Sequence, residues 1–144
     1  MSAARGFLLD TNVVSEWTRP RPDPGVVRWL AEVDEDRTYL SVATLAEVRH
    51  GVERLPAGDR RARLDARLTE ELTARFEGRV LPIDERVADR WGRVVAGAQA
   101  AGRPIATMDA FVAATALAGG LTLVTRNVRD FAAAGVEVLN PWSG

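Results

Sequence analysis

The spacing of apolar residues predicts a chain in which short strands alternate with helices. Short apolar runs bounded by turn residues are typical of buried strands, and an apolar residue at every third or fourth position is typical of helices that bury one face. On this pattern we expect strands at residues 7–9, 38–41, 79–83, 121–125 and 136–139. We expect helices at residues 10–17, 24–33, 42–55, 59–76, 84–101, 109–118 and 128–133.

This alternation indicates an α/β fold with a mostly parallel sheet flanked by helices. A chain of 144 residues without internal repeats is expected to form one domain, residues 1–144. In such folds, functional sites form beyond the carboxyl ends of the strands. Asp10 follows the first predicted strand, and Thr125, Arg126 and Asn127 stand at the end of the fourth. We therefore expect these residues to meet at one rim of the sheet.

Several acids stand near the openings of predicted helices, where each also has a purely structural explanation. Asp10 and Asp109 are suited to capping the helices that follow them. Glu47 lies three residues after Thr44, so the two fit a capping box in which backbone amides satisfy both side chains. Asp130 belongs to a polar loop. None is diagnostic alone, but an α/β sheet would bring these carboxylates together.

A divalent cation is the partner that such a cluster predicts, because neighbouring carboxylates repel one another unless protons or a cation intervene. Mg²⁺ and Mn²⁺ take their ligands from carboxylate, amide and water oxygens. The chain has no cysteine, which excludes disulfides, thiol catalysis and zinc–thiolate sites. It has no lysine either, which excludes P-loop nucleoside triphosphatases and Schiff-base enzymes.

The charge balance gives the whole molecule no attraction for nucleic acid, since the net charge is only −1. A polyanion must therefore meet a local arginine patch or a metal. Four arginines between residues 60 and 67 would form either an RNA track or a solvated helix face. The tryptophans are scattered and indicate core or interface anchors: Trp17, Trp29, Trp91 and Trp142. No apolar run has the length of a signal-peptide core or a membrane span, so we expect a soluble cytoplasmic protein.

Four blocks of the chain resemble PIN-domain ribonucleases of the VapC toxin type, in particular the FitB-like subgroup. The blocks are LLDTNVVSEWTRPRPD, YLSVATLAEVRHGVERL, ATMDAFVAATALAGGLTLVTRN and VEVLNPW. They follow the family's order and spacing over nearly the whole chain. The resemblance implies a PIN domain that hydrolyses RNA phosphodiester bonds with Mg²⁺ or Mn²⁺.

The resemblance also implies which residues form the catalytic site. Asp10, Glu47 and Asp109 match the family's three acids that bind metal. Asn127 stands where the family often has a fourth aspartate, so the site holds one negative charge fewer. Asp130 would reach the same face if its segment is helical, and it could then serve as a further metal ligand.

Other implied roles concern neighbouring side chains and partners. Thr11 and Thr125 would orient ligands or water, and Arg126 would bind substrate phosphate, with a surface ion pair as its alternative role. His50 is expected to lie outside the chemistry. By resemblance the protein forms a homodimer and binds a VapB-like antitoxin, which inserts a peptide, often with an arginine, into the acidic site.

Two other functions compete with a ribonuclease toxin. Asn127 keeps open a degenerate PIN domain that binds RNA or a protein without cleavage. A phosphatase of the haloacid-dehalogenase type would need a lysine and an aspartate two residues after Asp10, but that residue is Asn12. DNA in place of RNA is a variant of the nuclease hypothesis. The RNA target and the number of metal ions are not encoded in any of these motifs.

Overall fold

The computed structural model describes residues 6–143, which fold around a sheet whose strand pairings are all parallel. The five strands lie in the order β3-β2-β1-β4-β5. They are β1 (Phe7–Leu9), β2 (Thr38–Ser41), β3 (Val80–Leu81), β4 (Thr122–Val124) and β5 (Val138–Leu139). The predicted α/β fold with a parallel sheet is confirmed. The predicted domain also includes residues 1–5 and 144, which lie outside the described residues.

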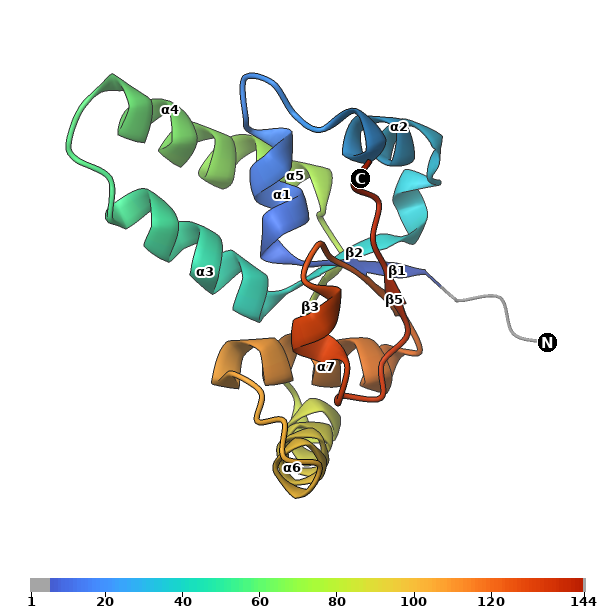
Figure 1. The fold of residues 1–144 in the computed structure, drawn as a ribbon. Helices are drawn as coiled ribbons and strands as arrows, with labels where there is room; N and C mark the ends of the chain where they lie inside the picture. Colours follow the sequence, from blue (N-terminus) through green and yellow to red (C-terminus); the bar gives the residue numbers. More distant parts are fainter. Residues whose placement is uncertain (1–5, 144) are drawn as a thin grey trace.

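Helices cover both faces of this sheet (Figure 1). They are α1 (Thr11–Trp17), α2 (Pro24–Glu32), α3 (Val42–Glu53), α4 (Asp59–Ala66), α5 (Thr73–Arg75), α6 (Glu85–Ala100) and α7 (Thr107–Gly119). Shorter helical segments are η1 (Glu35–Arg37), the π-helical η2 (Arg67–Leu72) and η3 (Val128–Phe131). Within the described residues, no helix combines the length and the apolarity needed to cross a membrane.

The two central strands bury side chains on both faces, because successive residues of a strand point to opposite sides. Leu8 and Leu123 are fully buried in a cluster formed mainly with α7. Leu9 and Val124 are buried in a second cluster with α1, α2, α3 and η2. Burial of each such side chain contributes about 1.5–3 kcal/mol to stability. This packing fixes the ends of β1 and β4, and it therefore also fixes the start of the segments that follow them.

Several predicted boundaries differ from the structure. β3 and β5 span two residues each, shorter than predicted, because an edge strand has a partner on one side only. The predicted helix at 59–76 contains the π-helical η2, which the spacing of apolar residues does not distinguish from an α-helix. The predicted helix at 128–133 is a short 3-10 segment. Asp109 lies in the first turn of α7 and does not cap it, because the N-cap is Ala106.

The capping box predicted for Thr44 and Glu47 is wrong. α3 begins at Val42, as predicted, with Ser41 as its N-cap, and the Ser41 hydroxyl accepts a hydrogen bond from the Ala43 amide at 3.0 Å. Thr44 is buried inside the helix, where its hydroxyl has no hydrogen-bond partner among the described residues. Glu47 lies one turn further along α3, and its carboxylate accepts a hydrogen bond from Thr11 at the start of α1.

Candidate active site at the carboxyl ends of the strands

Asp10 lies where β1 ends and α1 begins, and its side chain is only 4% exposed. Its Oδ1 accepts a hydrogen bond from the Thr11 amide at 2.8 Å, so it does cap α1. Its Oδ2 accepts from the Thr125 hydroxyl at 2.8 Å and from Asn12 Nδ2 at 3.5 Å. The predicted meeting of the ends of β1 and β4 is thus made through the Asp10 carboxylate, and capping accounts for only one of its oxygens.

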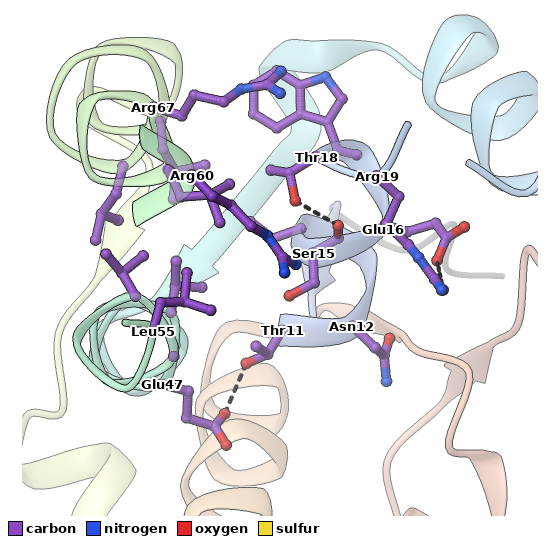
Figure 2. A pocket seen from close by; sticks show the side chains of 18 of the residues that line it. Thr11, Asn12, Ser15, Glu16, Thr18, Arg19, Glu47, Leu55, Arg60 and Arg67 are labelled. Atoms are coloured by element: carbon purple, nitrogen blue, oxygen red, sulfur yellow. Dashed lines mark hydrogen bonds and ion pairs between the residues drawn. The ribbon is translucent and has the colours of Figure 1, made fainter. Parts of the chain in front are cut away.

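Glu47 comes to the same rim from α3. Its Oε1 accepts a hydrogen bond from the Thr11 hydroxyl at 2.7 Å, as Figure 2 shows. Thr11 thereby links the acid of α3 to the start of α1, next to Asp10. This bond defines the direction of the Glu47 carboxylate, which helix geometry alone leaves free.

Asp109, in the first turn of α7, and Asp130, in η3, complete a cluster of acids whose charges act on one another. Burial raises the pKa of Asp109 to about 6, with further increases from the negative charges of Asp10, Asp130 and Glu47. Burial also raises the pKa of Asp10, against hydrogen bonds from Thr125 and Thr11 that lower it, and Glu47 and Asp130 add to the increase. We call these four residues the acidic cluster: Asp10, Glu47, Asp109 and Asp130.

Thr125 is fully buried and organises the end of β4. Besides donating to Asp10, its hydroxyl oxygen accepts from Asn12 Nδ2 at 3.1 Å and from the Asn127 amide at 3.0 Å. Asn127 is exposed and is brought to the rim through this backbone contact. Arg126 is also exposed, and its guanidinium lies over the ring of Trp142, 5.7 Å from the centroid. Among the described residues, Arg126 therefore contacts an aromatic ring and does not form the surface ion pair that was its alternative role.

Sequence reasoning missed Asn12 and Trp142 as parts of this site. Asn12 donates to Thr125 and Asp10, and its Oδ1 accepts a hydrogen bond from the Arg126 amide at 3.3 Å. Its place in the Asp10-Thr11-Asn12 run was a usable signal, since the run lies at the predicted rim. Nothing in the local sequence of Trp142 indicates that it lies beside Arg126.

A groove of about 520 Å³ lies between α1, α3, α4 and η2, and Glu47 is the member of the acidic cluster that lines it. Thr11 and Glu47 line one part of it, and the side chains of Arg60 and Arg67 face it from α4 and η2 (Figure 2). Valine and leucine side chains of α3, α4 and η2 form much of the remaining lining. His50 is exposed on α3 and is not among the residues that line the groove.

The chemistry of the acidic cluster fits a hard divalent cation, although its members do not form a closed cage. Burial and, to a lesser extent, repulsion between the acids raise the pKa values of Asp10 and Asp109, and a cation would offset both effects. Within residues 6–143, no three histidine, aspartate or glutamate side chains are arranged to hold one metal ion. Mg²⁺ commonly keeps several waters and binds through one or two carboxylates. The site therefore suits a hydrated ion better than the ion shared directly by three acids that the sequence predicts.

Comparison with known proteins identifies the family of this chain. The model of the PIN domain family matches residues 7–137. Toxin FitB of Neisseria gonorrhoeae is 44% identical over 136 residues, which cover 94% of this chain and 98% of that protein. VapC ribonuclease Y4jK of Sinorhizobium fredii is 39% identical, with coverage of 94% and 97%. The solved structure of FitAB bound to an IR36 DNA fragment superposes with a TM-score of 0.90 at 41% identity, and covers 96% of both chains. The chain belongs to the PIN domain family.

Proposed function

We propose that this protein is a metal-dependent endoribonuclease that acts as the toxin of a toxin–antitoxin pair. The observation that carries this proposal is the acidic cluster at the ends of the parallel strands, where burial and the charges of neighbouring acids raise the pKa values of Asp10 and Asp109. Relatives that cover almost the whole chain are named as a toxin and as a ribonuclease, which supports the same activity. The alternative, a PIN domain that binds without cleaving, lacks such support from any of these names.

In this proposal Asp10, Glu47 and Asp109 would hold a hydrated Mg²⁺ or Mn²⁺ ion, with Asp130 and Asn127 as further oxygen donors beside it. When bound, the cation supplies a water activated for in-line attack on phosphorus and balances charge on the phosphoryl oxygens. Asp10 is held for this task by two hydrogen bonds at 2.8 Å, one from the Thr11 amide and one from the Thr125 hydroxyl. Such outer contacts fix the direction of a metal-binding carboxylate.

The binding partner that we propose is an antitoxin with a cationic segment. Solved relatives include FitAB bound to a DNA fragment and a structure from Klebsiella pneumoniae described as a toxin–antitoxin complex. An arginine placed among Asp10, Glu47 and Asp109 would neutralise the same carboxylates as a cation, so metal and antitoxin would compete. We also propose that the protein is a homodimer, by resemblance to the family.

Cleavage assays with matched oligonucleotides test the nuclease. The purified chain is expected to cut single-stranded RNA with Mg²⁺ or Mn²⁺, to stop when EDTA is added, and to recover when the metal is restored. DNA of the same sequence, in the same assay, should be cut much more slowly. A chain that leaves a broad RNA pool intact under every metal would support the non-cleaving PIN domain instead.

Replacing Thr11 with valine should lower kcat about tenfold to a hundredfold, because Glu47 loses the hydroxyl that orients it. The branched side chain keeps nearly the same volume, so thermal unfolding should change little. Thr73→Val is the matched control, since the Thr73 hydroxyl donates only to the Thr69 carbonyl of the exposed helix. Equal kcat values for Thr11→Val and wild type would show that this bond does not serve catalysis.

A further inference from the structure

The segment that follows β5, residues 140–143, is fastened to the start of α2 by one carboxylate. Asp23 Oδ2 accepts a hydrogen bond from the Ser143 amide at 3.0 Å, and Oδ1 accepts from the Ser143 hydroxyl at 2.9 Å. Oδ2 also accepts from the Gly25 and Val26 amides, at 2.9 and 3.2 Å. These bonds, the Ser143 amide above all, lower the pKa of Asp23. One ionised side chain thus caps α2 and holds the segment.

Gly25 shows how closely the segment approaches the helix. A Cβ atom at this position would lie 2.4 Å from the Pro141 carbonyl oxygen and 2.7 Å from the Ser143 nitrogen. Both neighbours are backbone atoms, so a side chain here would displace the segment. We call this arrangement of Asp23, Gly25, Pro141 and Ser143 the clasp.

The clasp positions Trp142, which lies between Pro141 and Ser143. The Trp142 amide donates to Asn140 Oδ1 at 2.9 Å, and its half-buried ring packs on the core cluster beneath α1 and α2. The guanidinium of Arg126 lies over this ring. Arg126 and Trp142 both line the groove that Glu47 also lines.

Arg126 is tied to the acidic cluster through its backbone as well. Its amide donates to Asn12, and the preceding residue, Thr125, donates to Asp10. The backbone thus sets the base of the arginine beside the acids, and Trp142 supports its end. A guanidinium held over the face of an indole can still present N–H groups to a ligand, and these groups match the oxygens of a phosphate.

We propose that Trp142, held by the clasp, is a positioning residue that orients Arg126 to bind an RNA phosphate beside the acidic cluster. This inference rests on the proposed function, because it specifies how the substrate of that site is held. It assigns a role to three residues that are remote from the rim in sequence: Asp23, Gly25 and Trp142.

The salt dependence of RNA binding gives a direct test. Binding of a fluorescent single-stranded RNA is measured by anisotropy at several KCl concentrations, in EDTA and in an Asp10→Asn background that does not cut. Each phosphate contact contributes about 0.7 to the slope of log affinity against log salt. Arg126→Ala should weaken binding about five- to tenfold and reduce the slope by about 0.7. Trp142→Ala removes no charge, yet it should reduce the salt slope as much as Arg126→Ala does. Trp142→Phe, which keeps an aromatic ring, should retain most of the parental slope.

Gly25→Ala tests the clasp without altering either partner of the stack. Its Cβ should displace residues 141–143 and thereby reduce the salt slope towards that of Trp142→Ala. Gly92→Ala on α6 is the matched control, because a Cβ at Gly92 meets nothing within 4 Å. Thermal unfolding of each variant establishes that it is folded. The double variant Arg126→Ala, Trp142→Ala should bind no more weakly than Arg126→Ala alone, since both remove one interaction.

The outcomes separate this inference from the proposed nuclease. If Trp142→Ala and Gly25→Ala keep the parental slope, or if Arg126→Ala keeps it, the inference is overturned. Cleavage by the wild type with Mg²⁺ is measured alongside. If the wild type cuts RNA but the variants keep the parental salt slope, the proposed nuclease stands and the inference about Trp142 fails. If the slopes change but the wild type does not cut RNA, the inference stands and the proposed nuclease fails. A wild type that neither binds nor cuts RNA would overturn both.

Discussion

Replacing Asp10 with asparagine is expected to reduce metal-dependent RNA cleavage by about a hundredfold to a thousandfold. The change removes the buried charge that the Thr11 amide and the Thr125 hydroxyl hold in place, and with it a ligand that a divalent cation requires. Asparagine has nearly the same shape, so the capping bond to Thr11 can persist and the fold should be retained. Single-turnover rates with saturating enzyme in Mg²⁺ and in Mn²⁺ would measure the loss.

Asp89→Asn is the control for that loss. It also removes one negative charge, but from an exposed ion pair with Arg93 on α6, and its cleavage rate should equal that of the wild type. A variant at Asp10 that keeps more than about a tenth of the wild-type rate would show that the buried carboxylate does not bind the catalytic cation, and the proposed site would have to move.

The order of elements could be predicted because the local signals for burial agree with the tertiary structure. The apolar run at residues 7–9 becomes the central strand β1, and the uniformly apolar segment after Asp109 becomes the buried helix α7. The strand order could not be predicted, since it depends on which strands pair across long separations. The start of α3 at Val42 was predicted, but its cap was not, because Thr44 and Ser41 are both suited to capping and only the local backbone selects Ser41.

Part of the candidate site could be predicted, namely the part that follows from the order of strands and helices along the chain. Asp10 and Thr125 end adjacent parallel strands, so the topology alone brings them together. The hydrogen bond between Thr11 and Glu47 depends on how α3 packs against α1, which apolar spacing does not specify. The contact between Arg126 and Trp142 depends on the packing of residues 140–143 against the start of α2, and no local sequence pattern predicts that packing.

Replacing Asp109 with asparagine should abolish most cleavage and yet stabilise the metal-free fold at neutral pH. The pKa of Asp109 rises from 3.8 to about 6 in the folded protein, so folding favours the protonated acid. Its contribution to stability is therefore present below about pH 4 and is lost as pH rises through about 6. Asparagine stays neutral throughout. At pH 7.5 in EDTA the variant should gain about 1 kcal/mol, a figure reduced because the side chain is half-exposed and partly screened by solvent.

Thermal unfolding with and without metal distinguishes the cost of ionising Asp109 in the folded protein from a general effect of the substitution. In EDTA, Asp109→Asn should melt about 2–5 °C above the wild type at pH 7.5 and at nearly the same temperature at pH 4. Adding Mg²⁺ should stabilise the wild type more than the variant, because bound cation favours the folded state in proportion to its affinity. The advantage of the variant should then shrink or reverse. A lower melting temperature for Asp109→Asn in EDTA at pH 7.5 would mean that burial and the neighbouring acids do not disfavour this carboxylate, and that no cation is needed to offset its charge.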